Sequence, residues 1–295
     1  MLLVSLFFEP KVFWPREAYR FEFVLDITQS MNARDYHLKG YPEDRLGFAK
    51  AALREAIEAL PCGSEVGLGL FTTQSVHFLF EPLEVCEHLP VIRDALSHID
   101  WRMAWSADSH VEFGLYHAIR ELSKTDPKTR LVFLTDGQET PPQTVQPVFD
   151  LPPGTVKGLL VGVGGRSPVS VPRYDRDNHP IGIWENADIE KAPLSSTVYS
   201  LEVVTRALPS VGPYLSFLDE AHLQHLSSIT GMALTTLTEP SRFIRELQHP
   251  ALAEPRQTRT DLRPWIGLLS LILITAVFGI ERVRQVPPQD GDPGP

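Results

Sequence analysis

Cysteine is nearly absent from this 295-residue chain, which contains only Cys62 and Cys86 and no Cys-x-x-Cys pair. Two cysteines exclude a thiolate metal site and a framework of several disulfides. Basic residues are also scarce, since 27 Lys and Arg stand against 37 Asp and Glu, for a formal net charge of −10. A chain this acidic lacks the cationic surface that nucleic acids require, so nucleic acid is not expected as its main partner.

The first residues do not form a secretory signal peptide. Residues 1–19 open with the apolar run MLLVSLFF, which has no basic start and no small-residue cleavage site. We interpret this segment as an edge strand, a loose terminus or the remnant of a membrane segment.

The most informative stretch is residues 20–31, RFEFVLDITQSM. An apolar run ends in Asp26, and Thr28 and Ser30 follow at alternate positions. This pattern predicts a buried strand that delivers a carboxylate to its carboxyl end, where open parallel sheets bind ligands. The three side chains are hard oxygen donors, which suit Mg²⁺ or Ca²⁺. A strand that ends in an Asp/Ser turn and caps the next helix is the simpler alternative.

Apolar strands alternate with amphipathic helices through most of the chain. This alternation predicts an α/β domain with a doubly wound, mostly parallel sheet and helices on both faces. We expect strands at 20–25, 130–134, 156–163 and 233–238, hairpins at 65–80 and 171–184, and helices at 42–60, 89–99, 111–122, 218–228 and 240–247.

The C-terminal part has a different composition. Residues 265–280, WIGLLSLILITAVFGI, carry no charge and are flanked by Arg263 and Arg282, which can snorkel to an interface. We expect a membrane anchor here rather than a buried core helix. The chain then divides into an apolar segment at 1–19, the α/β domain at 20–248, a polar linker at 249–263, a transmembrane helix at 264–281 and a disordered tail at 282–295.

A second apolar strand ends like the first one, in the sequence RLVFLTDG with Asp136. Neighbouring parallel strands would hold Asp26 and Asp136 side by side. Ser109, in WSADSHVEFGL, precedes an expected helix and is a candidate third hydroxyl, with Ser106 as the alternative.

Together these motifs resemble the von Willebrand factor type A domain, whose metal-ion-dependent adhesion site uses Asp-x-Ser-x-Ser, a later Thr and an Asp in a motif like LTDG. The resemblance implies an Mg²⁺ or Ca²⁺ site made by Asp26, Thr28, Ser30, Ser109 and Asp136. Thr28 replaces a Ser and Ser109 replaces a Thr, and both keep the hydroxyl. The implied function is recognition: a partner protein supplies a carboxylate to an open position on the ion, and the chain is not an enzyme.

A narrower resemblance rests on DITQSMNARDY, LPCGSEVGLGLF, EVCEHL and DWRMAWSADS. These segments are similar to membrane-bound type A proteins found with MoxR-type ATPases, and most of all to accessory proteins of methanol oxidation. The resemblance implies a bacterial inner-membrane protein that works with a MoxR-type AAA+ ATPase and with methanol dehydrogenase maturation proteins, at the metal-loading step of that quinone-dependent enzyme. A periplasm-facing domain is favoured if residues 1–19 hold a membrane remnant, whereas Arg256, Arg259 and Arg263 favour the opposite orientation.

Three further groups of side chains are candidates for function. Trp105 either packs in the core or forms an exposed contact for a partner beside the ion. His222 and His225 lie three residues apart on a helix, which fits a solvated face better than a metal pair. Cys62 and Cys86 flank the first hairpin at the same edge, so we hypothesise a disulfide between them, which implies an oxidising compartment.

Two other functions are kept as alternatives. One is a metal-independent structural adaptor in a membrane complex. The other is a Mg²⁺-dependent phosphatase, because an Asp-x-Thr-x-Ser run after a strand is superficially similar to enzymes with an aspartate nucleophile. Such enzymes place a second acid where this chain has Thr28, so the general acid is missing.

Overall fold

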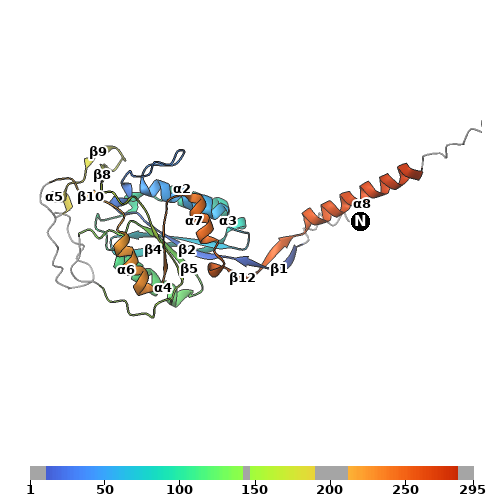
Figure 1. Ribbon diagram of the computed structural model, residues 1–295, viewed down its shortest axis with the longest axis horizontal. Helices are drawn as coiled ribbons and strands as arrows, with labels where there is room; N and C mark the ends of the chain where they lie inside the picture. The colour runs from blue at the N-terminus through green and yellow to red at the C-terminus, as the bar shows by residue number, and fades with distance from the viewer. Residues whose placement is uncertain (1–10, 142–146, 190–211, 285–295) are drawn as a thin grey trace, which may run out of the picture. The chain divides into compact units, whose positions relative to one another are not determined.

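The computed structural model describes residues 11–141, 147–189 and 212–284 (Figure 1). Two compact units are present: residues 17–254 form one, and residues 1–16 together with 255–295 form the other. The MLLVSLFF run lies outside the described residues.

The larger unit is built on a six-stranded sheet in which β2 is central. Strands β6, β5, β2 and β3 follow one another in parallel, β11 joins β6 in parallel, and β4 pairs with β3 in antiparallel fashion. In sheet order the strands are β11 (Ala233–Thr236), β6 (Gly158–Gly162), β5 (Arg130–Thr135), β2 (Arg20–Asp26), β3 (Glu65–Thr72) and β4 (Ser75–Glu84). The predicted mostly parallel α/β sheet is confirmed.

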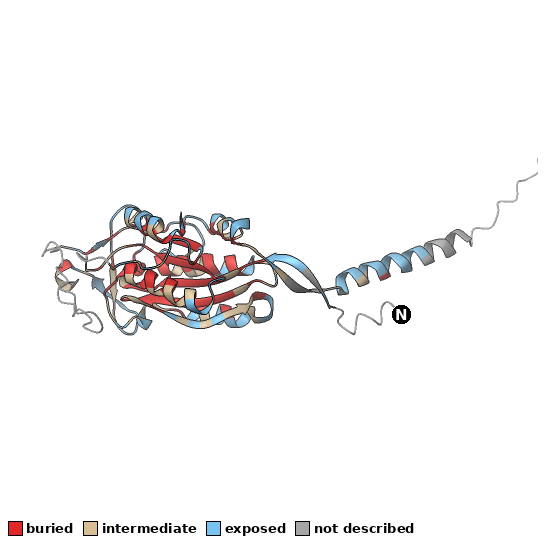
Figure 2. Ribbon diagram, turned by 90° about the horizontal axis from the view of Figure 1, so that it is seen from below, coloured by how far each residue is buried: buried red, intermediate tan, exposed pale blue. Residues whose placement is uncertain are grey.

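Helices cover both faces of this sheet, and the buried residues lie between them and the strands (Figure 2). One face carries α2 (Arg45–Glu58), α3 (Val85–His98) and α7 (Pro240–Leu247), and the other carries α4 (Val111–Thr125) and α6 (Glu220–Thr230). Phe21, Phe23 and Leu25 belong to the first core and Val24 to the second, because successive strand side chains point to opposite faces.

Local signals explain where the helices begin and end. Asp44 accepts a hydrogen bond from the backbone N of Gly47 at 2.6 Å, which starts α2 three residues later than the predicted 42–60. Helix α3 begins at Val85, four residues before the predicted 89–99, because the Glu84 side chain caps it. Gly231, with φ of 75°, ends α6 in the left-handed conformation that glycine adopts without strain.

Short elements complete the fold. The second expected hairpin is present as β8 (Pro172–Tyr174) and β9 (Pro180–Ile183). The remaining short elements are η2 (Gln29–Asn32), η3 (Trp101–Met103), β7 (Val169–Ser170), α5 (Asn186–Ile189) and β10 (Leu215–Ser216), and β7 pairs with β10.

The expected polar linker at 249–263 is structured instead. It contains η4 (Pro250–Leu252) and the strand β12 (Glu254–Asp261), which pairs with β1 (Lys11–Ala18) in a two-stranded sheet. Polar composition indicated a linker, but backbone pairing between two segments distant in sequence stabilises an extended strand whatever its side chains.

The C-terminal apolar segment forms α8 (Arg263–Arg284). Among the described residues, no helix has the length and apolar character needed to cross a membrane. The helix expected at 264–281 is therefore present, but its membrane crossing is not supported. Its uncharged run of 16 residues spans about 24 Å, less than a hydrocarbon core of about 30 Å. Residues 285–295 of the expected tail lie outside the described residues.

Cys62 and Cys86 form a disulfide with a Cα–Cα distance of 5.3 Å. Cys62 lies just before β3, and Cys86 lies just after β4. The bridge therefore closes the open end of the β3–β4 hairpin, at the amino end of β3 and away from the edge where β2 ends.

A carboxylate is buried in the middle of the central strand. Glu22 is 2 % exposed, its Oε1 has no hydrogen-bond partner among the described residues, and Gly67 on β3 leaves the space that it fills. Burial raises the pKa of Glu22 to about 8, although the charge of Arg20 opposes the shift. Glu22 is therefore protonated in the folded protein at neutral pH.

Glu22→Gln should remove a pH-dependent loss of stability. The raised folded-state pKa means that Glu22 supports folding fully below its unfolded pKa of 4.5 and loses this contribution as pH rises toward about 8. In urea denaturation, the variant should gain about 4 kcal/mol over the wild type at pH 8 and almost nothing at pH 4.5. Glu58→Gln, on the exposed end of α2, is the control. An equal gain at both pH values would contradict the buried neutral carboxyl.

Candidate metal site

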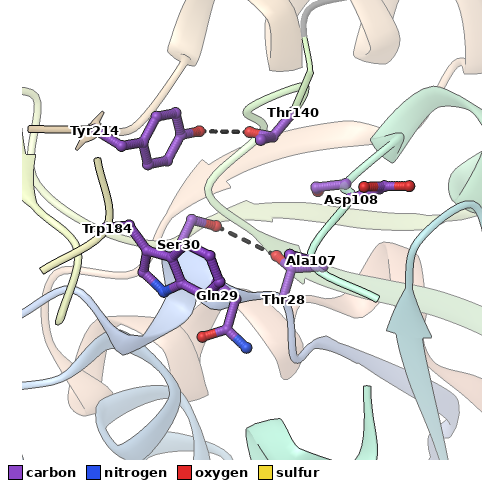
Figure 3. A pocket seen from close by; sticks show the side chains of 9 residues that line it. Thr28, Gln29, Ser30, Ala107, Asp108, Thr140, Trp184 and Tyr214 are labelled. Atoms are coloured by element: carbon purple, nitrogen blue, oxygen red, sulfur yellow. Dashed lines mark hydrogen bonds between the residues drawn. The ribbon is translucent and has the colours of Figure 1, made fainter. Parts of the chain in front are cut away.

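A small cavity lies at the carboxyl end of the parallel strands (Figure 3). It has a volume of about 20 Å³, which is the space of a single water molecule or ion. Segments far apart in the sequence meet here, and the lining residues are Thr28, Gln29, Ser30, Ala107, Asp108, Ser109, Thr140, Trp184 and Tyr214. The structure thus brings the three predicted hydroxyl residues Thr28, Ser30 and Ser109 to one cavity.

The hydroxyls of this cavity are not fully paired. Thr28 Oγ1 and Ser30 Oγ are 3.3 Å apart. Ser109 is 2 % exposed, and its Oγ has no hydrogen-bond partner among the described residues. Its backbone is held firmly, because its N donates to the carbonyl of Thr140 at 2.7 Å and its carbonyl accepts from Thr140 N at 2.8 Å. Ser106, the alternative, does not line the cavity.

Asp26 lies one hydrogen bond away from the cavity. Its Oδ1 accepts from the backbone N of Thr28 at 2.9 Å and from Thr28 Oγ1 at 2.7 Å, and its Oδ2 accepts from Thr135 Oγ1 at 2.6 Å. Burial and the neighbouring charge of Asp136 raise the pKa of Asp26 to about 7. A cation at this edge would stabilise the ionised form of Asp26.

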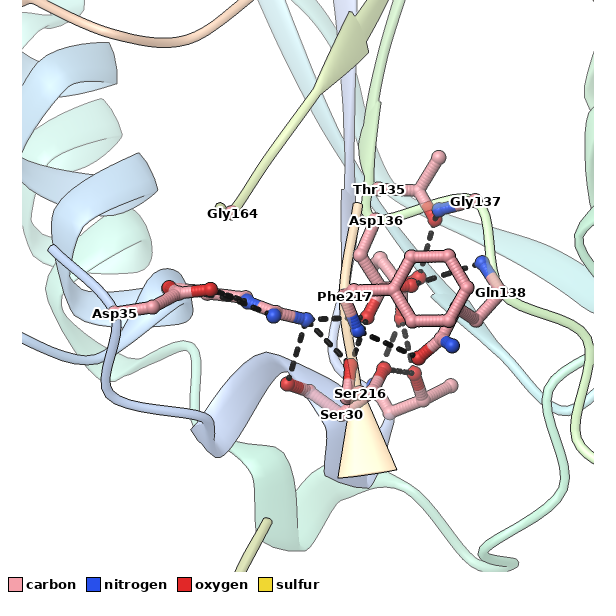
Figure 4. Close-up of polar contacts among 12 residues, drawn as sticks. Ser30, Asp35, Thr135, Asp136, Gly137, Gln138, Gly164, Ser216 and Phe217 are labelled. Carbon is pink, nitrogen blue, oxygen red and sulfur yellow. Dashed lines mark hydrogen bonds and ion pairs between the residues drawn. The ribbon is translucent and has the colours of Figure 1, made fainter. Parts of the chain in front are cut away.

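Asp136 is paired with a buried arginine (Figure 4). Its Oδ2 accepts from Arg45 Nη1 at 2.8 Å and from Ser216 Oγ at 3.1 Å, and its Oδ1 accepts from Gln138 N at 3.1 Å. Arg45 is 0 % exposed and also binds Asp35, with Nη2 2.7 Å from Oδ2. The guanidinium joins Asp136 to the cavity, since its Nη1 donates to the carbonyl of Ser30 at 3.4 Å.

Sequence reasoning missed Arg45, Asp35 and Ser216 as members of this site. A signal for Arg45 was available, because it lies on the apolar face of α2, four residues before Ala49 and eight before Leu53, both buried. An arginine in the first turn of a helix is also unfavourable beside the positive end of the helix dipole. An acidic partner from another part of the chain is therefore expected. No pattern in the sequence around Ser216 indicated that this residue belongs to the site.

The donor set fits a divalent cation. Three hydroxyls and two carboxylates are hard oxygen ligands of the kind that Mg²⁺ and Ca²⁺ prefer. Asp26, Asp35 and Asp136 are three carboxylates with one cation, Arg45, paired with the last two, and the buried carboxylate of Asp108 lines the same cavity. This excess of acidic groups favours a divalent ion, and the hydroxyl of Ser109 gives it an oxygen that no donor among the described residues occupies.

A second polar cluster lies beside Gly137. His222 Nδ1 is 2.6 Å from the carbonyl of Gly137, and His222 Nε2 is 3.1 Å from Glu112 Oε1. The interpretation of His222 as part of a solvated face is therefore wrong, whereas His225 is exposed. Burial lowers the pKa of His222, but the bonds to Glu112 and Gly137 outweigh it and raise the pKa to about 9.

Trp105 does not line the cavity. It is 61 % exposed and packs edge-on against His77, with ring centroids 5.0 Å apart. The side chain therefore offers an apolar surface on the loop that leads to Ser109, rather than a core contact.

Comparisons with known proteins agree with this architecture. Residues 21–138 match the family model of the von Willebrand factor type A domain. The structure resembles BatB from Bacteroides thetaiotaomicron, a conserved hypothetical protein, with 14% identity and a TM-score of 0.51 over 78% of this chain and 97% of that one. An aerotolerance-related membrane protein from Bacteroides fragilis shares 13% identity, with a TM-score of 0.49 over 78% and 96% of the two chains.

At 14% identity, the likeness to BatB shows a shared fold and no more. No sequence among the curated proteins matches the chain. The resemblance to accessory proteins of methanol oxidation finds no support among these matches.

The His222–Glu112 pair should stabilise the domain in a pH-dependent way. Because the folded-state pKa of His222 is about 9, its contribution is complete below the ordinary value of 6.5 and is lost as pH rises through about 9. His222→Gln should lower the free energy of unfolding by about 3 kcal/mol at pH 6 and by little at pH 10.

Urea denaturation across this pH range measures the difference. His225→Gln, three residues later on an exposed position of the same helix, is the matched control and should show no such dependence. A His222→Gln effect that stays constant from pH 6 to 10 would rule out the charged pair.

Proposed function

We propose that this von Willebrand factor type A domain binds Mg²⁺ or Ca²⁺ and uses the ion to hold a carboxylate of a partner protein. The observation that carries the proposal is Ser109, whose buried hydroxyl has no partner among the described residues and lines an ion-sized cavity with Thr28 and Ser30. The three hydroxyls would hold the ion, and Asp26 and Asp136 would balance its charge.

The bound ion would supply a Lewis-acidic position for an anionic group. The chain's own residues do the positioning: Thr140 fixes the backbone of Ser109, and Thr135 and Thr28 orient Asp26. Trp105, exposed on the loop before Ser109, offers an apolar contact of the kind that binding hot spots use.

A phosphatase function is disfavoured by the residues that follow the first strand. No acid stands at Thr28, two residues after Asp26, where that reaction would need one.

A metal-independent adaptor remains the second candidate because of one observation. Arg45 already pairs with Asp136 at 2.8 Å, so the site contains a cation of its own. An accessory role beside a MoxR-type ATPase, or in methanol dehydrogenase maturation, is proposed only because of the sequence resemblance.

Calorimetry of the full-length protein with Mg²⁺ and with Ca²⁺ tests the site. Asp26→Asn and Ser109→Ala should each weaken binding about tenfold or more, because one removes a charge and the other a ligand oxygen. Ser106→Ala is the matched control and should bind like the wild type. The ion should also raise the melting temperature, since it binds only the folded state.

The open coordination position can be tested with Mn²⁺ as a probe. Water proton relaxation should be enhanced by the bound Mn²⁺, and acetate should reduce the enhancement by displacing a bound water. Unchanged binding in Asp26→Asn would contradict the assigned site, and enhancement that acetate leaves intact would contradict an open position for a carboxylate. Absence of binding would favour the metal-independent adaptor.

We further propose that α8 attaches the protein to a membrane, with the domain in an oxidising compartment. Leu268, Leu269, Leu271, Ile272, Leu273 and Ile274 are all more than 40 % exposed. Because consecutive positions point all around a helix, the helix is apolar on every side and needs an apolar environment. The Cys62–Cys86 disulfide is typical of an oxidising compartment such as the periplasm.

Full-length protein should therefore sediment with phosphatidylcholine vesicles. The double substitution Ile272→Lys and Leu273→Lys should reduce the bound fraction about a hundredfold, because charged side chains are costly in hydrocarbon. Ser241→Lys, at an exposed position of α7, should sediment as the wild type does. Wild-type protein that stays in the supernatant would contradict the attachment.

A further inference from the structure

Arg45 occupies a compartment built for its guanidinium. The side chain is 0 % exposed and contacts Asp35, Asp136 and Ser216, the last at 2.6 Å from Nη1. Gly164, at φ of 109°, leaves the required space, because a Cβ there would lie 2.5 Å from Arg45 Nε. The next residue, Gly165, donates from its backbone N to Asp35 Oδ2 at 2.8 Å.

The guanidinium of Arg45 is hydrogen-bonded to Asp136, one of the two carboxylates proposed to balance the charge of the ion. Both oxygens of Asp136 are occupied, Oδ2 by Arg45 and Ser216 and Oδ1 by the backbone N of Gln138. Asp26 differs, because its partners are hydroxyls and a backbone N–H and none of them carries a charge. The two predicted acidic ligands are therefore not equivalent.

We propose that Arg45 is a resident cation that sets how tightly the site binds a divalent ion, with Asp35 as the second carboxylate that shares it. This inference rests on the proposed metal site and adds the residues that tune it. Arg45 repels the incoming ion and holds Asp136, and both effects weaken binding. Asp35, which does not line the cavity, strengthens ion binding by drawing part of the guanidinium charge away from Asp136.

The proposal predicts that ion affinity follows the net charge of Asp26, Asp35, Asp136 and Arg45, which is two negative charges when all four groups are ionised; Asp108, which also lines the cavity, is the same in every variant. Arg45→Gln raises this to three and should tighten Mg²⁺ binding about tenfold or more, whereas Asp35→Asn lowers it to one and should weaken binding by a similar factor. Arg45→Lys keeps the charge and should bind like the wild type.

Calorimetric titration of the full-length variants with Mg²⁺ and with Ca²⁺ measures this order. The double variant with Arg45→Gln and Asp35→Asn restores two negative charges and should return the affinity to within a few-fold of the wild type. Arg54→Gln, at an exposed position of α2, removes a positive charge far from the cavity and should change nothing.

The melting temperature without metal separates tuning from folding. If Arg45 is only structural, its variants will melt earlier and their Mg²⁺ affinities will not follow charge, which overturns the proposal. If Arg45→Gln does not fold, Asp35→Asn still decides, because an unchanged affinity there overturns the proposal and a weakened affinity supports it.

Failure of the metal site itself gives a different result. Binding by Arg45→Gln but not by the wild type supports the resident cation, since removing it opens the site. Absence of binding in both overturns the metal site and this inference together. Binding by the wild type that Asp26→Asn abolishes, but that ignores the charge order, overturns only the role of Arg45.

Discussion

The buried charge at the carboxyl ends of β2 and β5 is the constraint on which the site depends. Asp26 and Asp136 follow adjacent parallel strands, so the sheet itself forces two carboxylates together away from water. Such a pair is strongly unfavourable unless cations or hydrogen-bond donors face it. The donors supplied by Thr28, Thr135 and Arg45 meet part of that demand, and the proposed ion meets the rest.

The charges of the two carboxylates are compensated in different ways, which gives Asp26 and Asp136 different parts in the proposed site. Asp26 is surrounded by neutral donors close to the cavity, whereas Asp136 is locked to Arg45 behind it. A buried ion pair of this kind contributes little net stability but places a fixed charge beside the ligand position. On the proposed metal site, residues that never touch the ion would adjust how tightly it binds.

The opposite end of the sheet serves a different purpose. There the Cys62–Cys86 disulfide closes the β3–β4 hairpin, while the hydroxyl-lined cavity is confined to the end where β2 terminates. Glu22 lies along β2 between the two ends, and its uncharged form avoids adding a third charge to the centre of the sheet. The disulfide and the proposed recognition site thus lie at opposite ends of the strands of one sheet.

Local patterns in the sequence determined the strands of the six-stranded sheet, most helices and the three hydroxyl residues. Each of these follows from short-range rules, such as the apolar run before Asp26 and the alternation of Thr28 and Ser30. The β12 strand and the role of Arg45 could not be obtained in this way. Arg45 meets partners 10, 91 and 171 residues away in sequence, at Asp35, Asp136 and Ser216. Such contacts exist only once the sheet has brought its strand ends together, so the tertiary structure alone decided which carboxylate meets only uncharged donors and which is paired with a cation.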